Sequence, residues 1–170
     1  MRKILLICSL LLSIFIFGEN LLEKVVLNAQ LYETVNFSQL KLTILDAINL
    51  TNEKDVVAAY LAQVDKKIVW VVLTFNHEYG ISVEEAKILW KKPLETRFFA
   101  YAVGLREAIS LAVMSIGKNV LFGVYQTDSW LVGNNKNLAT VSMKTPAILK
   151  IESTQDVFKK VQQEMLKRQQ

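Results

Sequence analysis

Residues 68–75 read Ile-Val-Trp-Val-Val-Leu-Thr-Phe, and the interpretation of the fold starts from this run. It is β-branched and aromatic and lacks polar alternation, which is typical of a strand that is covered on both faces. Such a strand is the best candidate for the centre of a sheet. We predict that residues 69, 71 and 73 face one buried layer, while residues 68, 70 and 72 face another.

Before this run, the apolar pattern predicts a strand near residues 39–45 and then a helix over about residues 52–64. Thr51 can cap that helix, and the apolar residues within it have helical spacing. Residues 20–32 fit a helix and a strand equally well, so the pattern leaves both open.

After the run, residues 76–80 are predicted to form a turn, and Ser82 with Glu85 makes a capping box for a short helix that ends before Pro93. A long apolar helix is then predicted over about residues 95–116, ended by Gly117. Because it carries few charges, we expect it to lie across the sheet and to be buried on most of its circumference.

The remaining chain predicts a strand over residues 119–132, a loop, and a hairpin partner over residues 138–143. A further strand at residues 147–151 and a final helix opened by Ser153 follow. Helices and strands do not alternate regularly, so we expect an α+β fold with a mixed or antiparallel sheet. No linker, charge block or fixed-period repeat divides residues 19–170, which we therefore interpret as a single compact domain.

The first eighteen residues differ from the rest of the chain. Arg2 and Lys3 precede an apolar run from residue 4 to 17, which is the pattern of a signal peptide or an uncleaved signal anchor. We therefore expect an extracytoplasmic protein, either periplasmic, secreted or held at the membrane through residues 1–18. Cleavage after Gly18 would remove the only cysteine, Cys8, so stability must come from a packed core and not from a disulfide.

Several classes of chemistry are excluded by residue counts. The chain has one histidine and one cysteine, which excludes a two-histidine zinc site and every site built on several thiolates. The six glycines form neither a dinucleotide fingerprint nor a phosphate loop. We therefore predict no metal and no cofactor. Nucleic acid is not expected as a partner either, because the formal net charge of +4 falls to +2 once Arg2 and Lys3 are removed.

His77 is the candidate general base, because histidine titrates near physiological pH. Glu78 beside it and Asp128 are the candidate acidic partners, although neighbouring side chains on an extended segment point apart. Asp128 and Ser129 are adjacent, which also argues against a serine triad with His77.

A second group of residues is suited to binding. Arg106 lies within an apolar helix, where it either pairs with another element or faces a pocket as an anchor for an anion. Tyr125 and Trp130 could line that pocket, although aromatic residues in strands also serve as core.

The scarcity of catalytic groups favours a non-catalytic binding or structural module of the cell envelope, with a protein or a small molecule as partner. Two alternatives remain open at this point. One is a metal-independent hydrolase that uses His77 with an acidic partner, and the other is a membrane-anchored accessory subunit.

Overall fold

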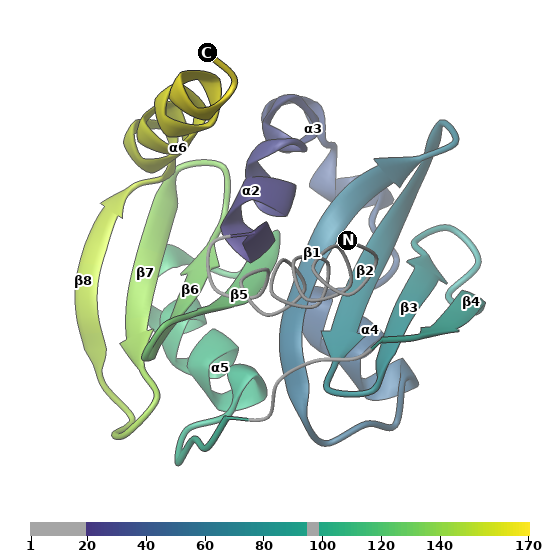
Figure 1. Cartoon of the computed structure of the whole chain (residues 1–170). Coiled ribbons are helices and arrows are strands. Elements are labelled where there is room, and N and C mark those ends of the chain that lie inside the picture. The colour runs from purple at the N-terminus through teal and green to yellow at the C-terminus, as the bar shows by residue number, and fades with distance from the viewer. Residues whose placement is uncertain (1–19, 95–98) are drawn as a thin grey trace, which may run out of the picture.

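The computed structural model describes residues 20–94 and 99–170, which form an eight-stranded antiparallel sheet with helices on both faces (Figure 1). The strand order is β4-β3-β2-β1-β5-β6-β7-β8. The strands are β1 (Val56–Val64), β2 (Lys67–Thr74), β3 (His77–Ser82), β4 (Ile88–Pro93), β5 (Phe122–Gln126), β6 (Ser129–Gly133), β7 (Asn137–Ser142) and β8 (Ile148–Ser153). The helices are α2 (Asn20–Val26), α3 (Ala29–Thr34), the short 3-10 turn η1 (Phe37–Gln39), α4 (Ile44–Leu50), α5 (Leu105–Ile116) and α6 (Thr154–Arg168). The α+β prediction is confirmed, with an antiparallel sheet.

The run at 68–75 forms β2, as predicted, and its residues from Val69 to Thr74 are buried on both faces. Trp70 points toward the α4 side, where its indole N–H donates a hydrogen bond to the Leu42 carbonyl at 3.1 Å. Val71 points to the opposite face. The middle of the sheet is the β1–β5 pair, so β2 lies one strand away from the centre.

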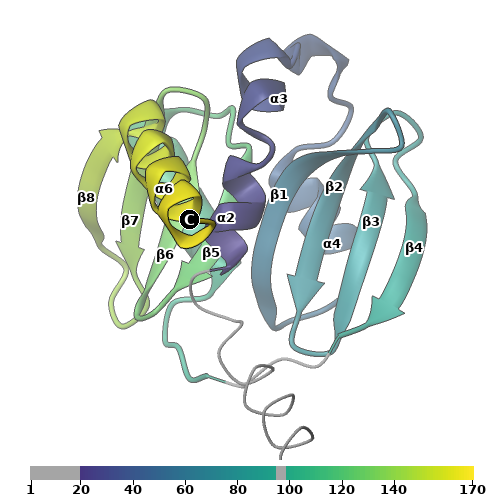
Figure 2. The ribbon, with the colours of Figure 1, turned by 45° about the horizontal axis from the view of Figure 1, so that its top comes forward.

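Adjacent residues of β5 identify which helices cover which face. A Cβ on Gly123 would lie 2.9 Å from Leu105 of α5, so α5 packs closely on that side. Phe122 points the other way and contacts Tyr32 of α3 and Phe158 of α6. Helices α4 and α5 therefore cover one face of the sheet, while α2, α3 and α6 lie on the other (Figure 2).

In the first half of the chain the structure corrects four predicted elements. The expected strand at 39–45 is a loop that leads into α4, whose capping box joins Thr43 to Asp46, and the expected helix at 52–64 is β1. Seven consecutive residues of β1 are buried, so its apolar residues also include the i, i+3 and i+4 spacing that is typical of a helix. The chain turns at residues 75–76, and residues 77–80 of the expected turn belong to β3. The expected helix before Pro93 is β4, since Ser82 caps only a turn through the Glu85 N–H.

The second half of the chain agrees better with the sequence. The long helix predicted to cover the sheet is shorter than expected: it is α5, which has 12 residues. It ends before Gly117, whose φ is 93°. The expected strand at 119–132 is the β5–β6 hairpin, which turns at Thr127. Strands β7 and β8 and helix α6 lie where they were predicted. The ambiguous segment 20–32 is helical, in α2 and α3.

The two halves of the sheet have the same organisation, which the sequence pattern did not reveal. A helix, α4 or α5, is followed by a four-stranded meander, β1–β4 or β5–β8, and the first strands of the two meanders pair at the centre. In each half a tryptophan on the second strand reaches back to the segment before the helix. Trp70 donates to the Leu42 carbonyl at 3.1 Å, and Trp130 donates to the Val103 carbonyl at 2.8 Å.

The same spacing of 60 residues recurs along both meanders. The side chain of Thr74 accepts backbone N–H groups in the turn after the second strand, and Asn134 does so 60 residues later. The Ser82 N–H donates to the Lys87 carbonyl at 2.9 Å, and the Ser142 N–H donates to the Ala147 carbonyl at 2.9 Å. The prediction that no fixed-period repeat exists is therefore wrong at the level of structure.

The expected signal segment, residues 1–18, lies outside the described residues. Within the described ranges, no helix combines the length and apolar character that a membrane crossing requires.

Candidate functional site

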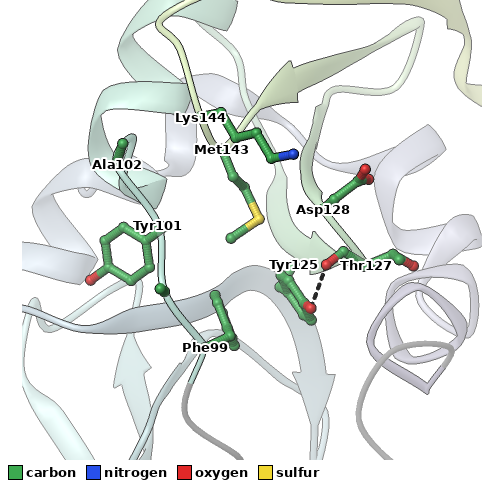
Figure 3. A pocket seen from close by; sticks show the side chains of 9 residues that line it. Phe99, Tyr101, Ala102, Tyr125, Thr127, Asp128, Met143 and Lys144 are labelled. Carbon is green, nitrogen blue, oxygen red and sulfur yellow. Dashed lines mark hydrogen bonds between the residues drawn. The ribbon is translucent and has the colours of Figure 1, made fainter.

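The candidate site is an open pocket of about 460 Å³ on the α5 side of the sheet. It lies among the segment that leads into α5, the β5–β6 turn and the turn after β7 (Figure 3). Its size is within the range of small-molecule sites. The lining residues are Phe99, Ala100, Tyr101, Ala102, Tyr125, Thr127, Asp128, Met143 and Lys144.

One wall of the pocket is aromatic. The rings of Phe99 and Tyr125 stack at a centroid distance of 4.0 Å and an interplanar angle of 14°. Behind them Trp130 is fully buried, with its ring 5.9 Å from Tyr101 and 6.1 Å from Tyr125, both edge-on. The hydrogen bond from Trp130 to the Val103 carbonyl fixes this buried ring, so the wall is built on a rigid base.

Met143 forms the opposite part of the lining. Its carbonyl accepts the N–H groups of Ala102 and Val103, each at 2.9 Å, which ties the segment before α5 to the end of β7. Figure 3 shows the thioether side chain in the middle of the pocket, between the aromatic residues and the charged rim. A flexible, polarizable thioether adapts its shape to an apolar ligand.

The rim of the pocket carries one charge of each sign. Lys144 and Asp128 are both exposed and come from different turns, and Figure 3 shows the Lys144 ammonium reaching across toward the side of Asp128. Between Tyr125 and Asp128, Thr127 has a φ of 51°, which is rare for a β-branched residue. Its carbonyl accepts the Tyr125 hydroxyl at 2.5 Å, which holds the turn against the aromatic wall.

Two of the three predicted binding residues meet at this pocket. Tyr125 lines it and Trp130 supports it from behind. Arg106 lies elsewhere, and its guanidinium donates to the carbonyls of Ile48, Glu53 and Lys54 and to the side chain of Asn49. It therefore holds the end of α4 and the loop before β1. Its role as an anchor for an anion stays a prediction.

The structure separates His77 from both of its predicted partners. His77 and Glu78 are adjacent on β3, so their side chains lie on opposite faces of the sheet. Glu78 Oε1 accepts the Trp90 indole N–H at 3.2 Å, whereas the His77 ring packs against Tyr79. Asp128 lines the pocket, and among the described residues the ion-pair partner of His77 is Glu53 and not Asp128.

The carboxylate near His77 is that of Glu53, which sequence reasoning missed. His77 Nδ1 lies 3.3 Å from Glu53 Oε1, and the same oxygen accepts the Tyr79 hydroxyl at 2.7 Å. Lys91 Nζ is 4.0 Å from this oxygen. Burial, followed by the hydrogen bond to Glu53, raises the pKa of Tyr79. Twenty-four residues separate Glu53 from His77, and no motif joins them.

The groups near His77 are a carboxylate, a phenol and an ammonium. Within the described part of the chain no hydrogen bond joins its imidazole to a serine, threonine or cysteine side chain. Histidine, cysteine, aspartate and glutamate also form no cluster of three or more that could hold a metal in the described ranges.

Comparisons with known proteins add one distant similarity. No protein-family model and no curated protein matches the sequence. A crystal structure from Clostridium difficile 630, of a protein described as a putative lipoprotein, is similar over 66% of this chain and 93% of its own, with 20% identity and a TM-score of 0.35. We base no inference on a similarity of this extent.

Proposed function

We propose that this protein is a non-catalytic binding module and that the pocket lined by Tyr125 and Met143 is its ligand site. The observation that supports this most directly is the combination of a rigid aromatic wall with oppositely charged side chains at the rim. Mostly apolar pockets with a few convergent polar groups are the usual form of a small-ligand site.

The chemistry of the lining indicates the kind of ligand. A flat or branched apolar group can pack on the stacked rings of Phe99 and Tyr125 and against the Met143 thioether. A polar head with both an amine and a carboxylate would meet Asp128 and Lys144 together. We therefore propose a small zwitterion with an apolar side chain, such as a free amino acid.

The proposed location is extracytoplasmic. It rests on the sequence of residues 1–18, in which two basic residues precede an apolar run of signal-peptide length. Whether the segment is cleaved or anchors the chain decides between a released module and a membrane-attached one.

The test is a titration of protein labelled with ¹³C at its four methionine methyl groups. Phenylalanine is expected to move the Met143 signal, while the signal of Met114, which is 83% exposed on α5, serves as an internal reference. Phenylacetate and phenethylamine each keep the ring and lose one charge. We expect both to bind about three- to tenfold more weakly, the usual effect of one lost polar contact.

Two charge-removing variants check the rim. Asp128→Asn and Lys144→Gln should each weaken phenylalanine binding, whereas Lys150→Gln, on the exposed edge strand β8, should leave it unchanged. If phenylalanine leaves the Met143 signal in place, or if the rim variants bind like the parent, this site assignment is wrong.

A further inference from the structure

A second hollow lies on the other face of the sheet, away from the pocket just described. It has a volume of about 360 Å³ and lies between the α2–α3 turn and strands β1–β4. We call it the Trp90 groove. The lining residues that matter for the argument are Lys24, Tyr60, Val71, Glu78, Trp90 and Lys92. Tyr60 and Val71 are cross-strand partners, so this groove opens on the α2 face.

The floor of the groove is an aromatic ring laid flat on the sheet. A Cβ on Gly80 would come within 2.1 Å of the Trp90 ring, so the ring lies directly on the β3 backbone. Its indole N–H donates to Glu78 Oε1 at 3.2 Å, which fixes the ring in its plane. Trp90 is half-buried, unlike Trp70 and Trp130, which are fully covered. One edge strand thus presents a fixed aromatic ring to the groove, with the Lys92 ammonium over it at 5.7 Å from the ring centroid.

Tyr60 supplies a polar group without a partner. The residue is only 7% exposed, and its hydroxyl makes no hydrogen bond within the described part of the chain. Burial, and then the nearby Glu78 carboxylate, raise the pKa of Tyr60, so the phenol keeps its proton and remains a donor. The hydroxyl oxygen is not fully buried, because Tyr60 lines the groove, and a ligand there can take the place of water as its partner.

The charged groups around the groove are of both signs. Lys24 and Lys92 supply ammonium groups that donate hydrogen bonds, and Glu78 supplies a carboxylate that accepts them. A purely apolar ligand would leave the Tyr60 hydroxyl without water and without a partner. A ligand with one apolar face and many groups that both donate and accept hydrogen bonds can use all of these side chains. Sugar hydroxyl groups have this property.

We propose that the Trp90 groove binds a neutral saccharide. One face of a sugar ring would stack on Trp90 in place of the Lys92 ammonium. Its hydroxyl groups would donate to Glu78 and would accept from Tyr60 and from the two lysines. The volume accommodates a unit of one or two rings.

The internal repeat supports a specialised role for this half of the sheet. Sixty residues after Glu78 and Gly80 the chain has Leu138 and Thr140, and 60 residues after Trp90 it has Lys150. On that half, α6 covers the same face of the sheet through Phe158. The first half has no such covering helix after β4 in the described residues, and the glycine–tryptophan pair with its polar neighbours occurs only there.

The experiment uses the full chain labelled with ¹⁵N, because its three indole N–H signals report on the three tryptophans separately. Maltose, cellobiose and N,N′-diacetylchitobiose are each titrated to millimolar concentration. We expect at least one of them to move the Trp90 signal while the signals of Trp70 and Trp130 stay in place and confirm the fold.

Two variants separate this groove from the pocket on the other face. Tyr60→Phe keeps the ring and removes the hydroxyl, and should weaken the active saccharide about three- to tenfold. Tyr125→Phe removes a hydroxyl in the other pocket and should change nothing here. The proposal is overturned if no saccharide moves the Trp90 signal, or if Tyr60→Phe binds like the parent. It is also overturned if the neutral peptide N-acetyl-triglycine amide moves the signal and the saccharides do not, which would identify a peptide groove.

Discussion

Arg106 joins the two halves of the molecule through a single side chain. It stands in the first turn of α5, and its guanidinium donates to the carbonyls of Ile48, Glu53 and Lys54 at 3.4, 2.6 and 3.2 Å. These oxygens belong to the end of α4 and to the loop before β1, where helix carbonyls lack partners within the helix. The charge therefore satisfies backbone groups of the other repeat.

Replacing Arg106 with Met keeps an unbranched apolar stem and removes all of these donors. Hydrogen bonds to a charged group contribute about 1.5–3 kcal/mol, so we expect the free energy of unfolding to fall by about 2 kcal/mol. Urea denaturation measures this change. The control is Lys118→Met, at an exposed site after the same helix, where surface substitutions stay within about 0.5 kcal/mol. A different result would identify Arg106 as an anion anchor. The Arg106→Met variant would then be as stable as the control, and added phosphate would stabilise the parent protein but not this variant.

Side chains that act alone were easier to predict than side chains that act together. Tyr125 and Trp130 were singled out from residue type and strand position; Tyr125 lines the pocket and Trp130 packs behind it, and their role in binding stays a prediction. Glu53 was missed because only the folded loop brings it to His77, at 3.3 Å from Nδ1. Glu78 was paired with His77 through its position in the sequence, but alternation along β3 sends it to the opposite face.

At the scale of elements, strands covered on both faces explain the main errors. Strand β2 was predicted because its β-branched run is too short and too uniform for a helix. Strand β1 is also buried on both faces, but its alanines and its Tyr60–Leu61 pair also fit a helical stripe. Residues 56–64 form a strand because they pair with both β2 and β5, and the local sequence pattern does not indicate these pairings.

Helix α6 offers a test of how one element is attached. It is capped by the Ser153 side chain, and Phe158 is its large buried apolar residue, in contact with Tyr32 and Phe122. Phe158→Ala should lower the free energy of unfolding by about 3 kcal/mol, because the lost ring leaves a cavity between α3 and β5. Leu166→Ala, at a position that is 61% exposed on the same helix, is the matched control and should change stability little. Equal urea midpoints for the two variants would contradict this attachment.

At the scale of the molecule, the repeat was invisible in the sequence because little of it is carried by identical residues. What recurs is the geometry of hydrogen bonds, such as those of Ser82 and Ser142 to carbonyls five residues further on. The short helices keep Ala47-Ile48 and Ala108-Ile109, which face the same core layer, but most other paired positions differ. The spacing of apolar residues indicates which residues are buried, but it does not indicate which backbone groups form corresponding hydrogen bonds in the two halves.

The two tryptophans test whether the repeats form one folding unit. Trp70→Phe and Trp130→Phe each remove an indole N–H that satisfies a carbonyl before α4 or α5, and each leaves a gap in the core. We expect each to cost about 2 kcal/mol. The halves share the β1–β5 ladder and the Arg106 contacts, so both variants should unfold in one cooperative transition. The double variant should then lose the sum of the two costs to within about 0.5 kcal/mol, since β2 and β6 are separated by β1 and β5 in the sheet. Urea unfolding followed by far-ultraviolet circular dichroism and by fluorescence checks this. Two separate transitions, with each variant shifting only one, would show instead that the halves fold as independent domains.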